Sequence, residues 1–343
     1  MRDKHDINHS EDALGGMDTG RRGKRKTCMR HCAKFWWAYL IAFICFVVLI
    51  VCLIIFVAVP KIAQHKLDEA ELTVDGITLS NTKSNSYTMS INSTLRSDGK
   101  VSATIEPFEG AMYLEDLEPH TPFVTINFPE TKSVKMQTVN VSQPIQIADM
   151  AAFTTFNTWF QANESVRVTI RGDTHVKVSG ISKRYPVTFK NTVTLKALHE
   201  FSGLNVTESE ISLTPDARGD NFHGKVTIPN HSVITLEIGN ASFSNILNNG
   251  NIGTVFIDNL VLHPGNNDVE MRANISQAPV LTALGKRPAC ESGVIAFGLQ
   301  GKDVVNGGER LSYFADALAA GTVATDINVG GALKKIGLNI PCS

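Results

Sequence analysis

The stretch that decides the fold is FVTINFPETKSVKMQTVNVSQ, residues 123–143, because it aligns without a gap on IDNLVLHPGNNDVEMRANISQ, residues 257–277. In this alignment Ile126 faces Leu260, and the two segments end on NVSQ and NISQ, 134 residues apart. Apolar and polar residues that alternate in this way are typical of strands with one buried face. The alignment therefore indicates that one kind of β-domain occurs twice in the chain.

The same alternation of apolar and polar residues also matches between the two halves of the chain before and after this stretch. At the same offset Ile77 matches Ile211, and a block after residue 165 agrees at an offset of 129 residues. Many short strands separated by turn residues favour a sandwich or barrel over alternating βα units. We expect a mainly β protein with two tandem antiparallel β-sandwich-like domains, residues 71–200 and 201–343, the second a repeat of the first.

Two segments show helical rather than strand spacing. In IADMAAFTTFNTWF (147–160) apolar residues recur every three to four positions, and GERLSYFADALAAG (308–321) behaves similarly. We expect a few short helices packed on the sheets. The first helix offers two interpretations, ordinary core packing or one wall of an apolar cavity. The residues that would form such a wall are Met150, Phe153, Phe156, Trp159 and Phe160.

An uncharged segment, FWWAYLIAFICFVVLIVCLIIFVAV, occupies residues 35–59. About 20 apolar residues in a helix cross the core of a bilayer. A cleaved signal peptide has an apolar run of only about 7–15 residues behind a short basic region, whereas this longer run follows 34 polar residues. The sequence thus favours an uncleaved signal anchor, followed by a stalk at residues 60–70, over a signal peptide or a buried core helix.

The charges around this segment predict its orientation. Residues 21–34 carry seven Lys/Arg and no acidic residue, whereas residues 60–343 carry 23 basic and 28 acidic side chains. The positive-inside rule then places the N-terminus in the cytosol and residues 60–343 in a lumen or outside the cell. We expect residues 1–34 to be a disordered basic tail. Its run at 21–34 either contacts anionic lipid headgroups or only sets the topology.

The cysteines fall on different sides of the span. Cys28 and Cys32 directly precede it, where palmitoylation occurs, and plain free thiols are the alternative. Together with His31 they lack the fourth ligand and the usual spacing of a metal site, and we expect no cofactor. Cys290 and Cys342 lie beyond the span, where an oxidising compartment allows them to form a disulfide bond.

Seven Asn-X-Ser/Thr acceptor motifs for N-glycosylation lie beyond the span, which is a mild excess over chance and fits the secretory pathway. Their asparagines are Asn92, Asn140, Asn163, Asn205, Asn230, Asn240 and Asn274.

Two further stretches carry a resemblance, PDARGDNFHGKVTIPNHSVITLEIGNASF (215–243) and IGTVFIDNLVLHPGNN (252–267). Together with the basic tail and single span, they resemble a fungal family of unknown function, the domain of unknown function 3712. Its members are mostly described as anchored in the vacuolar membrane or another endomembrane. The plan is also similar, more distantly, to late-embryogenesis-abundant type 2 β-sandwiches and to AsmA-like lipid-handling proteins. The resemblance implies a fold and a location but no catalytic residues.

The absence of catalytic motifs and the charge of the part beyond the span narrow the expected classes of function. The part beyond the span contains none of the common hydrolase, metalloprotease or nucleotide-binding motifs, and its acidic balance disfavours nucleic-acid binding. We therefore expect a non-catalytic membrane-anchored protein that binds a lipid, another apolar ligand or a protein partner. The alternatives are a structural or stress-protective surface protein and, less favoured, a lumenal hydrolase. The vacuolar or another endomembrane is the expected location, with the plasma membrane as the alternative.

Overall fold

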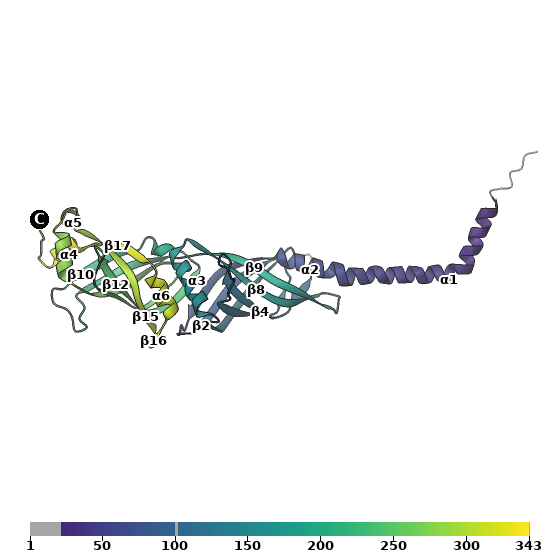
Figure 1. Ribbon diagram of the computed structural model, residues 1–343, viewed down its shortest axis with the longest axis horizontal. Coiled ribbons are helices and arrows are strands. Elements are labelled where there is room, and N and C mark those ends of the chain that lie inside the picture. The colour runs from purple at the N-terminus through teal and green to yellow at the C-terminus, as the bar shows by residue number, and fades with distance from the viewer. Residues whose placement is uncertain (1–21, 100–101, 343) are drawn as a thin grey trace, which may run out of the picture. The chain divides into compact units, whose positions relative to one another are not determined.

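The computed structural model describes the backbone of residues 22–99 and 102–342, and the side chains of residues 35–99 and 102–342 (Figure 1). The chain divides into two compact units, Met1–Lys61 and Ile62–Ser343. We describe each unit by itself.

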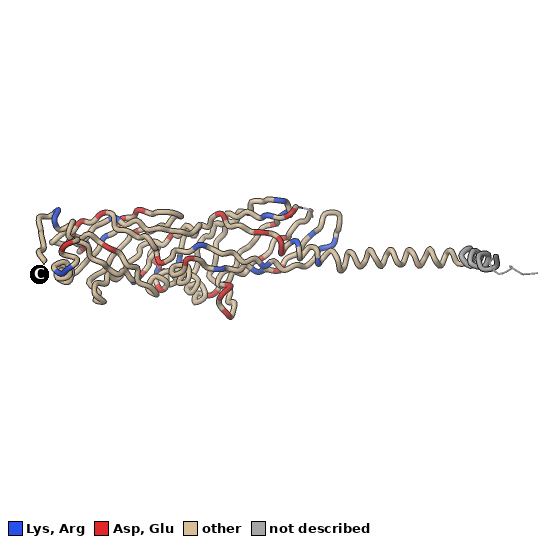
Figure 2. The backbone as a smooth tube through the Cα atoms, turned by 90° about the horizontal axis from the view of Figure 1, so that it is seen from above, with Lys and Arg blue, Asp and Glu red and all other residues tan. Residues whose placement is uncertain are grey.

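The first unit is helical where it is described. Helix α1 (Arg22–Leu53) continues through a π-helical turn, η1 (Ile54–Ala58), to the start of α2 (Val59–Asp68). The helical segment Phe35–Asp68 is long and apolar enough to cross a membrane, and its most apolar window is not buried inside the protein. Figure 2 shows the uncharged part of this helix as a continuous tan coil.

The expected disordered tail differs from the structure over part of its length. Residues 22–34 continue helix α1, with a change of backbone direction at Phe35, where φ is −116° and ψ is 17°. Most of residues 22–34 are long unbranched side chains that favour helices, and the chain has no proline before Pro60 to interrupt the helix. Residues 1–21 lie outside the described residues.

The second unit contains a large, almost entirely antiparallel sheet. Its main path runs β10-β11-β14-β13-β12-β1-β2-β7, while β15 pairs with β12 and itself carries β16 and β17. The pairing of β1 with β12 is parallel. The strands are β1 (Glu71–Ser80), β2 (Ser86–Arg96), β7 (Met136–Gln146), β10 (Asn205–Ile211), β11 (Phe222–Asn230), β12 (Ile234–Leu247), β13 (Gly250–Leu262), β14 (Gly265–Ile275), β15 (Val294–Asn306), β16 (Glu309–Arg310) and β17 (Thr322–Asn328).

A smaller sheet is made only from the first half of the unit. It runs β5-β4-β8-β3-β6, and β9 pairs with β8. Its strands are β3 (Ala103–Ile105), β4 (Phe108–Leu114), β5 (Val124–Phe128), β6 (Thr131–Lys132), β8 (Ser165–Val178) and β9 (Arg184–Lys196). The mainly β fold with an N-terminal apolar helix and a few short helices, predicted from sequence, is confirmed.

The two halves of the unit pair their strands in the same order. The path β1-β2-β7 corresponds to β10-β11-β14, and β5-β4-β8-β9 corresponds to β13-β12-β15-β17. The halves share the large sheet because β1 pairs with β12, and the second half joins its own strands through β13 and β14. The expected boundary at residue 200 lies in η2 (His199–Phe201), but the contacts hold residues 62–343 in a single compact unit.

Helices fill the space beside the sheets. Helix α3 (Met150–Ala162) begins where the side chain of Asp149 accepts a hydrogen bond from the N–H of Ala152, and it packs on α6 (Ser312–Ala319). Helix α6 lies within the predicted segment 308–321, and α3 overlaps the segment 147–160 and ends two residues beyond it, so those two helix predictions are confirmed. The remaining helices are α4 (Gln277–Leu284), α5 (Ala289–Ser292) and α7 (Val329–Lys335).

Candidate functional site

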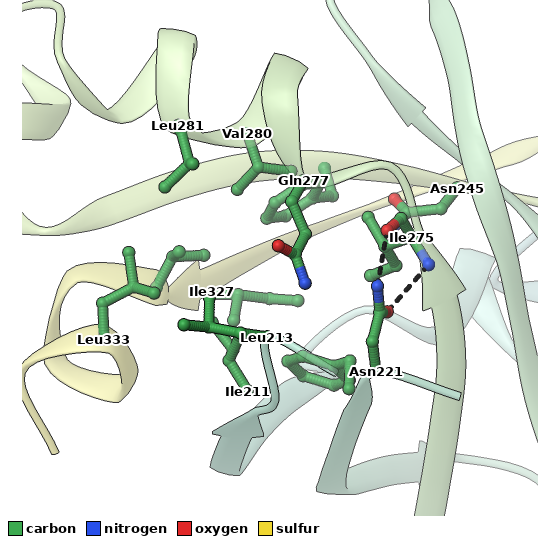
Figure 3. Close-up of a pocket in the computed structure, with 13 residues that line it drawn as sticks. Ile211, Leu213, Asn221, Asn245, Ile275, Gln277, Val280, Leu281, Ile327 and Leu333 are labelled. Atoms are coloured by element: carbon green, nitrogen blue, oxygen red, sulfur yellow. Dashed lines mark hydrogen bonds between the residues drawn. The ribbon is translucent and has the colours of Figure 1, made fainter. Parts of the chain in front are cut away.

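An apolar pocket lies where the ends of several strands meet helices α4 and α7 (Figure 3). Its volume is about 50 Å³. A buried water needs roughly 10–15 Å³ on a comparable measure, so the pocket suits a slim group such as part of one alkyl chain. The thirteen lining residues are Ile211, Leu213, Asn221, Phe222, Asn245, Ile275, Gln277, Val280, Leu281, Phe297, Ile327, Val329 and Leu333.

The wall beside β11 is fixed by Asn221, whose side chain takes the place of a strand partner. Its Oδ1 accepts a hydrogen bond from the N–H of Ile275 at 2.9 Å, and its Nδ2 donates to the carbonyl of Ile275 at 2.7 Å. Figure 3 shows both bonds. Gln277, at the start of α4, donates from Nε2 to the carbonyl of Ser212 at 2.9 Å. These bonds tie α4 and the chain after β10 to the sheet.

An ion-pair network holds the loop that leads into Asn221. Arg272 donates to the buried Asp220 at 2.9 Å and to Asp258 at 3.0 Å, and its guanidinium lies over the ring of Phe256, 4.4 Å from the centroid. The hydrogen bonds from Arg272 lower the pKa of Asp258, and those to Asp258 and Asp220 raise the pKa of Arg272. Asp216 accepts N–H bonds from the same loop, which lowers its pKa. The ion pairs of Arg272 therefore support the loop that leads into this wall of the pocket.

Among the lining residues, whose side chains the structure describes, Asn245 is the one with a buried polar atom that lacks a hydrogen-bond partner. It lies in β12 between Gly253 of β13 and Leu299 of β15, and its relative exposure is 1%. Its Oδ1 is buried without a hydrogen-bond partner. Buried polar atoms are nearly always paired, so this oxygen is an unsatisfied acceptor in the pocket lining.

The wall of the pocket formed by α7 is followed in the chain by a disulfide bond. Val329 and Leu333 of α7 line the pocket, and α7 begins where the side chain of Asn328 accepts a bond from the N–H of Gly331 at 2.7 Å. Beyond α7, Cys342 forms a disulfide bond with Cys290 of α5, with the Cα atoms 5.2 Å apart. The bond fixes the segment after α7 against α5.

The aromatic residues of α3 lie in the core and do not line this pocket. Phe153, Phe156 and Phe160 are buried, and Phe153 stacks on Tyr87 with 5.5 Å between ring centroids. Met150 and Trp159 are partly buried against the same core. A separate cleft of about 280 Å³ is lined in part by the capping residue Asp149 and by Ala151, Ala152 and Thr155 of α3.

Six of the seven glycosylation candidates are exposed on strands or at element ends, namely Asn92, Asn140, Asn163, Asn205, Asn240 and Asn274. Asn230 is the exception, with an exposure of 2%. Its Nδ2 donates to the carbonyls of Ile234 and Leu262, and its Oδ1 accepts from Ser232. The folded unit leaves no room for a glycan there, so the expectation for Asn230 is corrected.

The remaining sequence candidates lie before the residues with described side chains. Cys28, Cys32 and the basic run at 21–34 fall in this region, so their palmitoylation and lipid contacts stay predictions. Among the described side chains, no group of three or more His, Cys, Asp or Glu is placed to hold a metal ion.

No pattern in the sequence indicates the pocket. Its walls come from residues between 211 and 333, and α4 contains Pro279 and spans only eight residues, so it lacks a clear helical pattern. Asn245 stands in the ordinary strand sequence FSNIL.

The family that matches part of this chain has no assigned function. Residues 121–245 match the family described as "Protein of unknown function (DUF3712)", a match that runs from β5 into β12 and ends at Asn245. No curated protein matches the chain. Two structures of a bacterial adhesin from Mobiluncus mulieris, containing intramolecular disulfide, isopeptide and ester bond cross-links, are similar at 8% and 9% identity. Each covers 75% of this chain and 98% of its own, with TM-scores of 0.21 and 0.20, which are too low to support a fold argument.

Proposed function

We propose that this protein is a single-pass, membrane-anchored, non-catalytic binding protein whose second unit takes a slim apolar ligand into the pocket between α4 and α7. The observation that carries the proposal is the lining itself, which has thirteen residues, none of them charged. Each methylene buried there contributes about 0.8 kcal/mol. A few polar groups in an apolar pocket are typical of ligand sites.

The proposed topology has the N-terminus in the cytosol and residues 62–343 in a lumen or outside the cell. Two observations support it, the seven basic residues at 21–34 and the bond between Cys290 and Cys342. Disulfides persist in oxidising compartments and are rare in the cytosol. The resemblance to vacuolar and other endomembrane proteins favours such a membrane, with the plasma membrane as the alternative.

Photolabelling tests the binding proposal. The full chain in lipid nanodiscs is irradiated with an alkanol that carries a diazirine on its chain, and the labelled peptides are mapped by mass spectrometry. We expect label in peptides that contain Leu213 and Leu281. Leu281→Trp should fill the pocket and remove this label. Thr282→Trp, on the exposed side of the same helix, should keep it.

Equal labelling of the Leu281→Trp variant and the unchanged protein would overturn the proposal. The protein would then fit a partner-binding, structural or stress-protective role, in which the pocket is only a packing defect.

A further inference from the structure

We infer that the ligand of this pocket is a neutral amphiphile that donates a hydrogen bond, most simply from a hydroxyl group, to Oδ1 of Asn245. The inference rests on the proposed function and adds the chemistry of the ligand's polar end. In this arrangement the polar end of the ligand lies at Asn245 on the inner wall. The apolar part of the ligand lies against α4 and α7.

The other buried asparagines of the second half show what is missing at Asn245. Asn221 uses its oxygen and its nitrogen on the backbone of Ile275, and Asn230 uses both on the segment 232–234 and on Leu262. Asn267 accepts from the N–H of His263 and donates to three carbonyl oxygens. Asn245 is as deeply buried as these residues, at 1% exposure, but its oxygen has no partner in the described part of the chain. An acceptor left in this state is costly unless something enters to donate to it.

The charge of the site selects among possible polar groups. A carboxylate or phosphate would bring a negative charge to an acceptor oxygen, and no lining residue is a Lys, Arg or His. In the loop network that leads into Asn221, Asp220 and Asp258 already engage Arg272. An ammonium group would lose its hydration without gaining a carboxylate among the lining residues. A neutral hydroxyl satisfies the oxygen without either cost.

The shape of the site matches one polar end on a slim chain. The volume of about 50 Å³ excludes a bulky head. Leu213 lines the pocket and is 57% exposed, so the pocket reaches the surface beside it. A chain can therefore enter past Leu213 with its hydroxyl leading toward Asn245.

The test is a competition series against the diazirine alkanol in the nanodisc-held full chain. The competitors are 1-octanol, 1-methoxyheptane and octanoate. The first two have the same atoms but differ in whether the oxygen carries a proton. Their free concentrations are measured, so that partitioning into the lipid is corrected. We expect 1-octanol to displace the label at about one tenth of the concentration needed for 1-methoxyheptane, and octanoate to be weaker than both.

Two variants assign the preference to Asn245. Asn245→Leu has a similar shape without a polar group, so the ratio between alcohol and ether should fall to about one. The melting temperature should hold or rise, because an unpaired buried acceptor is removed. Asn245→Asp keeps an acceptor and should retain the preference for the alcohol.

Equal displacement by alcohol and ether in the unchanged protein would overturn the inference, as would a preference that survives in Asn245→Leu. Either result would leave the apolar binding site in place, because label blocked by Leu281→Trp reports on the pocket alone. Label that no competitor displaces and that Leu281→Trp does not block would reject the proposed function itself.

Discussion

Ile77 of β1 lies in parallel register with Ile234 of β12, and its N–H donates to the carbonyl of Val233 at 3.1 Å. This pairing joins strands from the two halves of the second unit in one sheet. Ile77 is also buried, so the junction is both hydrogen-bonded and packed.

Weakening the pairing of β1 with β12 should destabilise both halves of the second unit. Ile77→Ala leaves a cavity and should lower the free energy of unfolding by about 3 kcal/mol. Hydrogen exchange should then show faster exchange of β2 in the first half and of β12 and β13 in the second. Thr78→Ala, at the exposed neighbouring position, serves as the control. Faster exchange confined to β1 and β2 would mean that the halves are stable independently.

The disulfide bond should stabilise the pocket end of the unit. Cys290 and Cys342 are 52 residues apart, and closing a loop of this length is worth about 4 kcal/mol in the chain-entropy model. The double change to serine should lower the urea midpoint and weaken labelling of Leu333 in α7. Cys45→Ser in the apolar helix controls for loss of a thiol. An unchanged midpoint would contradict the role assigned to this bond.

The loop network should make stability depend on acid pH. Because hydrogen bonds from Arg272 lower the folded-state pKa of Asp258, its contribution is fully present above the unfolded-state value of about 3.9. It is lost as the pH falls through the lower folded-state pKa. Asp258→Asn should therefore lower the free energy of unfolding at pH 6 to 7 by less than about 1 kcal/mol. The melting temperature should fall slightly as a result. Below pH 4 the two proteins should converge.

The matched control for this titration is Glu71→Gln, which removes an exposed carboxylate at the start of β1. A difference between Asp258→Asn and the unchanged protein that grows as the pH falls would show that the carboxylate does not act through Arg272.

Glycosylation should avoid Asn230. In glycopeptide mass spectrometry of protein from a secretory host, Asn230 should be unmodified in folded material, because its amide nitrogen is buried and bonded. Exposed candidates such as Asn205 and Asn274 are sterically open. Asn230→Gln should lower stability and leave the glycan mass unchanged. A glycan on Asn230 in folded protein would contradict the burial of this side chain at the end of β11.

The sequence predicts the strands well because burial on one face leaves a period of two that can be read directly. It also predicts helices α3 and α6, whose buried faces recur every three to four residues. The same periodicity says which face of α3 is buried but not whether a void lies beside it. The phenylalanines expected to line a cavity pack in the core instead, with Phe153 against Tyr87 and Tyr313.

The pocket could not be predicted for a different reason. Its walls meet only after the chain has folded, since Ile211 and Leu333 are far apart in sequence and both line it. An unpaired oxygen such as Oδ1 of Asn245 depends on the geometry of three neighbouring strands. The sequence contains no local pattern for such an environment. The sharing of one sheet by the two halves likewise depends on the pairing of β1 with β12, which joins residues more than 150 positions apart.

Native mass spectrometry of the full chain, released from the membranes in which it is made, tests the central claim most directly. The unchanged protein and Thr282→Trp should each carry a small neutral molecule with an alkyl chain and a hydroxyl group, and Leu281→Trp should carry none. The same molecule on Leu281→Trp, or no molecule on any of the three proteins, would contradict the account of the pocket as a binding site.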